Sequence, residues 1–451
     1  MTKDMKDGSG EEKVVTRFAP SPTGLLHGGN YRTAVFAYLF AKKTDGEFII
    51  RIEDTDKQRS KKEYEDNIWE TIGWLNLMPD RRFRQSEHQG RHSELLQKLI
   101  EEGKAYVSNE EIKKEGDRAE VIRFKNPNKS VTFIDVIRGP ITIDTTDLHD
   151  FVIARSLEEP VFHFAVVVDD ADAGVTHIVR GEDHISNTPR QILIQEALGF
   201  KTPTYAHLPL VLDASRAKLS KRRGAKALTQ YRDEGYLPEA IINYLALLGW
   251  HPEGEQEVFS VSELIEAFSL DRIQKAAGIF DDVKLKWFNH EHLKKLTDQD
   301  FLYRLNEFFA LKAKTPPAII ERVLPLLRER SQTLGEAYEA LSGGEYDFLT
   351  HEPDPAKELL LKGAKADAST VATHLAKIEE LMQGLPEQFT ADEVKNAIFP
   401  YATEVGRGAV LWPMRVALSG KEKSPDPFTL ASLLGQKTTL VRIKKALEMV
   451  Q

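Results

Sequence analysis

The sequence of 451 residues contains no cysteine, so the protein has no disulfide, no thiolate zinc site and no thiol nucleophile. An excess of positive charge is also missing: 61 Lys and Arg stand against 70 Asp and Glu, a formal net charge of −9. A globally basic surface for nucleic acid is therefore excluded. A local basic patch is not, because binding depends on where the positive charges lie.

Long hydrophobic runs are absent as well. Nowhere do about 18 apolar residues follow one another, which is the length that a membrane-spanning helix requires. Residues 1–13 mix acids with lysines around no apolar core, so they are neither a signal peptide nor a transit peptide and are expected to form a flexible tail. Together with the lack of cysteine, this predicts a cytoplasmic protein without a membrane partner.

The remaining composition is that of a folded protein, with 41% hydrophobic and 29% charged residues. At roughly 150 residues per domain, the length predicts about three domains. Wholesale disorder is excluded, since it requires few apolar residues and a large charge imbalance.

The front of the chain has the rhythm of a parallel sheet. A strand at 14–19, a turn at 20–24, a helix at 31–43 and a strand at 47–52 form a βαβ unit. The segments predicted further along are a helix at 61–75, a strand at 175–179, a helix at 188–198 and a strand at 208–212. The pattern predicts an α/β, Rossmann-type domain made of residues 14–104 and 161–234.

Residues 105–160 interrupt this rhythm with short alternating segments, such as 131–136 and 141–143, and are predicted to be an α+β insertion. After residue 235 the chain reads as helical. The helices predicted there are 238–248, 262–268, 298–311, 317–334, 370–382 and 438–450. We divide this part into regions 235–310 and 311–451.

A glycine-rich turn after the first strand is the first candidate for chemistry. It contains His27, Gly28, Gly29 and Asn30 at the carboxyl edge of the predicted sheet, where α/β folds bind ligands. The glycines let the backbone approach a phosphate, and the side chains of His27 and Asn30 can donate hydrogen bonds to its oxygens. For two glycines and a histidine alone, a tight turn with a helix cap is the favoured interpretation.

The second candidate is a basic loop, residues 216–226, with six Lys or Arg among eleven residues and no acid. A solvated loop is the commoner fate of such a run. Lysines on both sides of Ser220, here Lys218 and Lys221, can instead close over a polyphosphate. They would then stabilise the charge that develops on the α-phosphate and on the leaving pyrophosphate.

Taken together and in order, the motifs indicate a function more specifically than each does alone. In chain order they are TRFAPSPTGLLHGGN, RIEDTD at 51–56, IVRGEDHISNTPRQ at 178–191 and KLSKRRG at 218–224. This series resembles the bacterial glutamyl-tRNA synthetases, a family of class I aminoacyl-tRNA synthetases, with HGGN for the family's HIGH and KLSKR for its KMSKS signature. GYLPEAIINYLALLGW, LKWFN and GRGAVLWPMRVALSG extend the resemblance toward the C-terminus.

The resemblance implies a glutamate–tRNA ligase that uses ATP with Mg²⁺ and acts as a monomer on tRNA(Glu); whether it also charges tRNA(Gln) stays open. Region 235–310 would contact the tRNA stem, region 311–451 would bind the anticodon, and the insertion would meet the acceptor end. The catalytic residues implied are His27, Lys218, Ser220 and Lys221. ATP would contact His27, Gly29, Asn30, Lys218 and Lys221. Glutamate would contact Arg17, Ala19, Ser21, Glu53, Phe162, Arg180 and His184.

Chemistry supports several of these roles. A planar guanidinium suits a carboxylate, which fits Arg17 and Arg180, and Glu53 would hold the α-ammonium group. One departure is Phe162, where the family usually has Tyr within PTYxFA. Losing one hydrogen bond to a charged group costs on the order of 1.5–3 kcal/mol unless water or His163 replaces it.

A second departure concerns zinc. Many relatives place Cys-x-Cys where this chain has Val107, Ser108 and Asn109, and zinc needs about four N, S or O ligands. We expect no zinc. Residues 107–120, rich in Glu and Lys, are instead predicted to form a short surface helix starting at Ser108, a residue type that caps helices.

Four alternatives compete with this interpretation. A glutaminyl-tRNA synthetase would end in β-barrels rather than helices, and the tRNA-queuosine glutamylating paralogue would lack the helical back half. Other nucleotidyltransferases with an HxGH loop lack RIEDTD. A non-catalytic tRNA-binding paralogue would not need His27, Lys218 and Lys221 intact. Arg328 and Arg330 are candidate anticodon readers, although a solvated helix face explains them as well.

Overall fold

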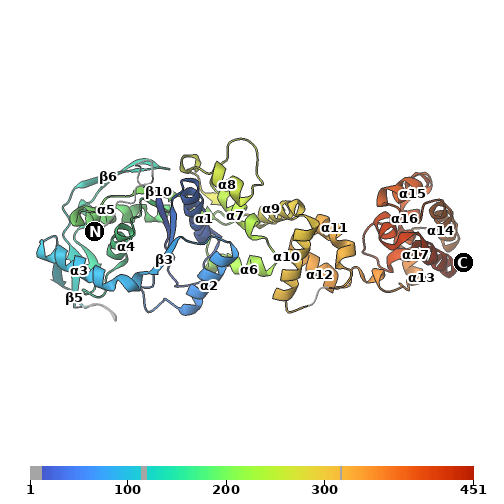
Figure 1. Ribbon diagram of the computed structural model, residues 1–451, viewed down its shortest axis with the longest axis horizontal. Coiled ribbons are helices and arrows are strands. Elements are labelled where there is room, and N and C mark those ends of the chain that lie inside the picture. The colour runs from blue at the N-terminus through green and yellow to red at the C-terminus, as the bar shows by residue number, and fades with distance from the viewer. Residues whose placement is uncertain (1–12, 113–118, 315–316) are drawn as a thin grey trace. The chain divides into compact units, whose positions relative to one another are not determined.

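Alternating strands and helices build a seven-stranded sheet in the first part of the chain (Figure 1). The computed structural model describes residues 13–112, 119–314 and 317–451, apart from the side chain of Lys221. The predicted tail thus lies outside the described residues except for Lys13, whose Nζ donates to Glu47. The chain divides into two units, Met1–His292 and Leu293–Gln451.

The strands of the large sheet lie in the order β3-β2-β1-β9-β10-β6-β7. All neighbours pair in parallel except β6 and β7, which form an antiparallel hairpin. The bounds are β1 Val15–Phe18, β2 Glu47–Ile52, β3 Arg81–Arg84, β6 Ser130–Asp135, β7 Gly139–Asp144, β9 His177–Gly181 and β10 Thr204–Leu208. The parallel strands confirm the Rossmann-type prediction.

Alternation along the strands produces two hydrophobic layers, one on each face of the sheet. Ile50 and Val179 belong to one core cluster, while their neighbours Ile49 and Ile178 belong to the other. The first cluster packs under α1 Gly28–Lys43, α2 Lys62–Trp74, α6 Leu228–Asp233, α7 Pro238–Leu247, α8 Val261–Ala267 and α9 Asp282–Lys295. The second packs under α3 Gln89–Glu101, α4 Phe162–Asp172 and α5 Thr188–Leu198.

The predicted insertion is not a separate body. Its hairpin β6–β7 extends the main sheet, because Tyr205 of β10 pairs with Asp135 of β6. The rest forms a three-stranded antiparallel sheet of β4 Ala105–Asn109, β5 Glu120–Phe124 and β8 Phe151–Ala154. Among the described residues of 105–160 none is α-helical, and the only helical turn there is a 3₁₀ turn, Thr146–Leu148.

The helix predicted from Ser108 is wrong. Ser108 lies within β4 opposite Val121 of β5, and the Arg123 side chain of β5 donates to Glu110 at 2.7 Å. Cross-strand pairing thus outweighed the capping preference of serine, a local signal that tertiary context often overrides. Residues 113–118, within the predicted helix, lie outside the described residues.

The strand predicted at 208–212 is placed too late in the chain. The sheet strand β10 ends at Leu208, and β11 Val211–Leu212 pairs in parallel with β12 Gly278–Ile279 in a small second sheet. Pro209 cannot donate a hydrogen bond to a ladder, which is consistent with a strand that ends before it.

The second unit is helical, as predicted. Its helices are α10 Asp298–Leu311, α11 Ile320–Arg330, α12 Leu334–Ser342, α13 Lys357–Lys362, α14 Ala368–Gln383, α15 Ala391–Val405, α16 Arg407–Ser419 and α17 Pro427–Val450. The predicted helix 438–450 is the second half of α17, which bends at Gly435, where φ is 76°. Among the described residues, no helix is long and apolar enough to span a membrane.

Candidate active site

Four buried charged side chains interlock where β1, β2 and α4 meet. The Nη1 of Arg51 donates to Asp170 at 2.6 Å and its Nη2 donates to Glu53 at 3.0 Å. Arg17 donates through Nε to the same Asp170 carboxylate at 3.3 Å. Glu53 comes directly after β2, where a parallel sheet places its ligand-binding groups.

The charges in this cluster do not cancel evenly. Burial alone would raise the pKa of Asp170, but Arg17 and Arg51 beside it hold that pKa below its usual range. Burial raises the pKa of Glu53, and the same two arginines offset only part of the rise. Glu53 therefore gains from an additional cation, which an α-ammonium group would supply.

Ala19 and Ser21, also predicted as site residues, lie in the loop that follows β1 and are half-buried. The backbone N–H of Glu53 donates to the carbonyl of Pro20 at 3.0 Å, so this loop is tied to the end of β2. The backbone of Ser21 accepts from Thr23 at 2.9 Å. The structure thus brings Ala19 and Ser21 to the edge of the charged cluster.

Arg180 differs from the other two buried arginines. Its Nε donates to the Nε2 of His207 at 3.1 Å and its Nη2 donates to the Oγ1 of Thr188 at 2.8 Å, and both acceptors are neutral. Among the described residues no carboxylate forms an ion pair with it. Burial lowers the pKa of Arg180 to about 10. The guanidinium still carries its charge at neutral pH, and Asp170 and Glu53 act on it through space without bonding to it.

Three aromatic rings, those of Phe162, His163 and His184, lie near Arg180. Phe162, the first residue of α4, lies 5.5 Å from the ring of His163 and 5.6 Å from that of His184, centroid to centroid. Burial, with the charge of Arg180, lowers the pKa of His184 to about 4, and burial with Arg190 and Arg180 does the same for His163. Both imidazoles are therefore neutral at pH 7.

The glycine-rich turn forms a helix cap, which is the structural interpretation that the sequence analysis gave for this motif alone. The backbone N–H of Gly29 donates to the Nδ1 of His27 at 3.1 Å, and the backbone N–H of His27 donates to the Asn30 side chain at 3.1 Å. This capping box fixes the start of α1. A side chain at position 28 would lie 2.9 Å from the Phe280 ring, so this position needs glycine.

The basic loop reaches the same region. The Nζ of Lys218 donates to Asp183 at 2.9 Å, and Asp183 precedes His184. Ser220 is half-buried and its carbonyl accepts from Arg223 and Ala225, which closes the loop into a turn. The side chain of Lys221 lies outside the described part of the chain.

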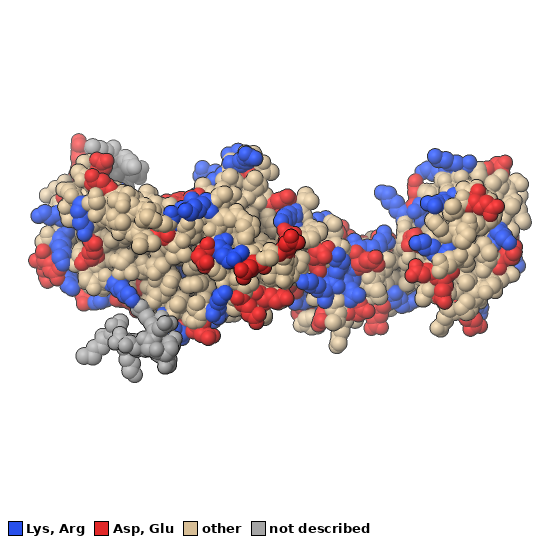
Figure 2. Space-filling model, turned by 90° about the horizontal axis from the view of Figure 1, so that it is seen from above, with Lys and Arg blue, Asp and Glu red and all other residues tan. Residues whose placement is uncertain are grey.

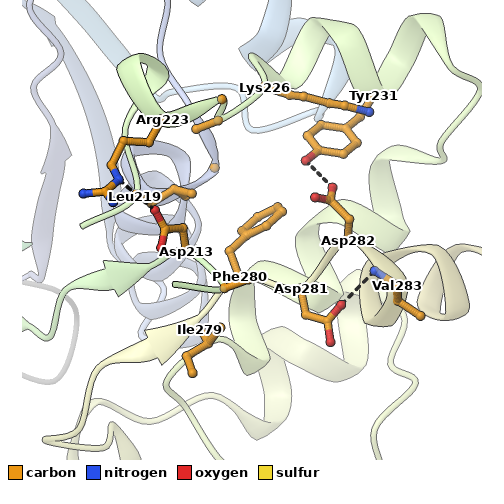
Figure 3. Close-up of a pocket in the computed structure, with 14 residues that line it drawn as sticks. Asp213, Leu219, Arg223, Lys226, Tyr231, Ile279, Phe280, Asp281, Asp282 and Val283 are labelled. Atoms are coloured by element: carbon orange, nitrogen blue, oxygen red, sulfur yellow. Dashed lines mark hydrogen bonds and ion pairs between the residues drawn. The ribbon is translucent and has the colours of Figure 1, made fainter. Parts of the chain in front are cut away.

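A cavity of about 550 Å³ lies between this loop, the start of α1 and residues 279–283 (Figure 3). Phe280 points into it, Arg223 pairs with Asp213 at 3.3 Å on one side, and on the other the hydroxyl of Tyr231 donates to Asp282 at 2.7 Å. Because Gly28 lines the cavity, the glycine-rich turn and the basic loop face one another.

The structure therefore places Arg17, Glu53, Arg180, Phe162 and His184 in one region, with the HGGN turn and the KLSKR loop as its neighbours. Sequence reasoning gave no role to the supporting residues, which are Arg51, Asp183 and Thr188 within the quoted motifs and Asp135, Asp170 and His207 outside them. Asp169 and Asp170 directly follow the apolar run Val166–Val168, and two acids at the end of a buried segment could have marked them as site residues. In the described part of the chain, no cluster of three His, Asp or Glu side chains could hold a metal ion.

Arg328 and Arg330, the candidate anticodon readers, lie at the end of α11. Arg328 donates to the carbonyl of Leu296 and pairs with Asp298 at 2.8 Å, and Arg330 pairs with Glu345 at 3.4 Å. Both guanidinium groups thus pair with acids of the second unit in partly exposed contacts, which are weak enough to exchange for another anion.

Comparison with known proteins agrees with this geometry. A model of the catalytic domain of the class I tRNA synthetases (E and Q) matches residues 13–116 and 108–287, and one of an anticodon binding domain matches residues 285–447. The Rossmann-type sheet and the groups at its carboxyl edge therefore define a class I aminoacyl-tRNA synthetase.

Similar full-length proteins narrow the class. A glutamate–tRNA ligase of Aquifex aeolicus is 40% identical, over 97% of this chain and 99% of its own length. The structure of a glutamate tRNA ligase from Elizabethkingia meningosepticum, in complex with its amino acid, is similar at 31% identity and a TM-score of 0.82, covering 98% of this chain and 100% of that one. The structure of a glutamate–tRNA synthetase from Elizabethkingia anophelis is also similar, at 31% identity and a TM-score of 0.79. The match covers 97% of this chain and 100% of that one. The chain belongs to the glutamate–tRNA ligase family.

Proposed function

We propose that this chain activates L-glutamate with ATP to glutamyl-adenylate and transfers the glutamyl group to the 3′-terminal adenosine of tRNA(Glu), forming AMP and diphosphate. The observation that carries the proposal is the buried guanidinium of Arg180, which has only neutral acceptors, close to the acid Glu53. An amino acid with a second carboxylate supplies an anion for Arg180, which has no ion-pair partner among the described residues, and an ammonium group for Glu53, whose pKa burial keeps raised.

Recognition of glutamate would use the interlocked side chains. Arg17 and Arg180 bind substrate carboxylates, and Glu53 accepts from the α-ammonium group. Ala19, Ser21, Phe162 and His184 form the walls of the pocket. Because burial removes competing water, these ionic hydrogen bonds are stronger than they would be on the surface.

Activation of ATP would use the capped turn and the basic loop. His27, Gly29 and Asn30 would lie against the phosphates, and Lys218, Ser220 and Lys221 would close from the loop. Catalysis would consist of positioning and charge stabilisation, without a covalent enzyme intermediate. We expect Mg²⁺ to enter with the ATP phosphates, where it would neutralise part of their charge.

Binding of tRNA must rely on local basic surfaces. Figure 2 shows Lys and Arg interspersed with Asp and Glu on the face drawn, in keeping with the net charge of −9. We propose that the insertion meets the acceptor end, that residues 235–310 contact the stem and that residues 311–451 bind the anticodon. Affinity should then fall by several-fold or more between about 50 and 200 mM salt, and a flat Kd would contradict phosphate contacts.

The test is aminoacylation with purified components. With ATP and Mg²⁺, the chain should charge tRNA(Glu) with glutamate. As is typical of the family, ATP–pyrophosphate exchange should require tRNA. Charging of a different amino acid would overturn the assignment, and absence of exchange with tRNA present would indicate a non-catalytic paralogue. Purified tRNA(Gln) as substrate decides whether the enzyme discriminates between the two tRNAs.

We further propose that the enzyme works without zinc, as a monomer in the cytoplasm. The lack of cysteine supports both the absence of a thiolate site and a reducing compartment. Metal analysis should find well under one zinc per chain, and EDTA should inhibit only by removing Mg²⁺. Stoichiometric zinc that survives dialysis would refute the first part, and a dimer in light scattering the second.

A further inference from the structure

We infer that His207, held by Asp135, is a positioning residue that orients Arg180 for the substrate carboxylate. The inference rests on the proposed function, because it assigns Arg180 to glutamate. His207 and Asp135 both lie outside the sequence motifs. Arg180 and His207 are direct neighbours on the paired strands β9 and β10, so backbone register places their side chains together.

The hydrogen bonds fix the protonation of His207. The Nε of an arginine can only donate, so the Nε2 of His207, 3.1 Å away, must accept and carries no hydrogen. The proton is then on Nδ1, which donates to the Oδ2 of Asp135 at 2.7 Å. His207 is therefore the neutral imidazole in one defined tautomer, and Asp135 selects that tautomer.

Asp135 is itself rigid. Its Oδ1 accepts from the backbone N–H groups of Ile137 and Arg138 at 2.9 and 2.8 Å, and its Oδ2 also accepts from the backbone N–H of His207 at 2.9 Å. Asp135 ends β6, so the hairpin of the insertion holds the acid that sets the tautomer. The insertion thereby contributes to the amino acid pocket as well as to the sheet.

This arrangement leaves the charge of Arg180 for the substrate. His207 and Thr188 take the Nε hydrogen and one Nη2 hydrogen, and the ring of Tyr205 lies 5.2 Å from the guanidinium carbon. Among the described residues, the Nη1 has no partner. Neutral acceptors fix the plane of the guanidinium without compensating its charge, whereas a carboxylate, as at Arg17, would compensate it.

The experiment is a kinetic comparison of His207→Phe with the wild type. Phenylalanine keeps an aromatic ring beside Tyr205 but has no nitrogen to accept from Arg180. The KM for glutamate should rise about tenfold or more, since a hydrogen bond to a charged group is lost. The KM for ATP should change by less than about twofold, because the proposed function assigns Arg180 to glutamate and not to ATP.

His374→Phe is the matched control. It removes the same ring nitrogens from a buried histidine of the second unit, whose Nδ1 lies 2.7 Å from the hydroxyl of Tyr401. Its KM for glutamate should equal that of the wild type. If His207→Phe folds poorly, Thr188→Val removes the other neutral acceptor with little change of volume. It should raise the KM for glutamate by about twofold to tenfold.

A double-mutant cycle separates positioning from a merely structural role. If His207 acts through Arg180, then His207→Phe in an Arg180→Lys background should change the KM for glutamate by less than about twofold. Lysine has no guanidinium group, so His207 has nothing left to orient. Additive effects, or an unchanged KM in both His207→Phe and Thr188→Val, would overturn the inference while leaving glutamate charging intact. A wild type that charges no glutamate would overturn the proposed function instead.

Discussion

The two sides of the active site are built differently. On the glutamate side, Arg17, Arg51 and Asp170 are buried and joined by ionic hydrogen bonds, at 3.3 Å from Arg17 and 2.6 Å from Arg51. On the ATP side, Lys218 pairs with Asp183 in a contact where both side chains are about half exposed, at 59% and 48%. A rigid set of charges suits recognition of a small ground-state ligand, whereas a mobile lysine can follow charge that develops during the reaction.

The largest loss of stability is expected on the glutamate side, at Asp170. Replacing Asp170 by alanine leaves the buried cations Arg17 and Arg51 without their shared anion, which should cost about 3–5 kcal/mol of unfolding free energy. Urea denaturation measures this loss. Asp172→Ala, two residues further along α4, breaks only the partly exposed pair with Arg91 and should cost less than about 1 kcal/mol. Equal losses in the two variants would contradict the proposed difference between buried and exposed charges.

On the ATP side the largest effect should be on rate. Lys221→Ala should lower kcat by about 100- to 1,000-fold, since it removes a cation that acts in the transition state, while the KM for ATP changes little. Arg216→Ala removes an exposed charge of the same loop outside KLSKR and serves as control, with kcat unchanged. A wild-type kcat in Lys221→Ala would remove this lysine from the mechanism.

The candidate residues of the ATP side are easier to recognise in the sequence than the support of the glutamate side, for a physical reason. The HGGN turn and the KLSKR loop are local motifs, each complete within a few residues. The support of Arg180 comes from His207 and Asp135, which are distant in sequence and meet only through strand register. Asp170 was missed because α4 is buried around Val166–Val168 and so lacks the periodicity that marks an amphipathic helix.

A smaller effect is expected from restoring the family's hydroxyl on the glutamate side. Phe162→Tyr should lower the KM for glutamate by about tenfold if its hydroxyl bonds to the substrate carboxylate, and leave the KM for ATP unchanged. The buried Nδ1 of His163 has no hydrogen-bond partner among the described residues, so it could already serve this role. In that case the gain should appear only in the double variant Phe162→Tyr with His163→Phe, relative to His163→Phe alone.

The smallest effect on stability is expected where the ATP side is most exposed. Removing Lys218 breaks the 2.9 Å ion pair with Asp183, but an exposed pair contributes only about 0–1 kcal/mol, because water already screens its charges. Lys218→Ala should therefore denature at nearly the same urea concentration as the wild type while its kcat falls. Asp183→Asn, which removes the partner and keeps the lysine, should be equally stable in urea. A loss in either variant approaching that of Asp170→Ala would mean that the basic loop is held as firmly as the glutamate pocket, and that its lysines are not free to follow the charge of the reaction.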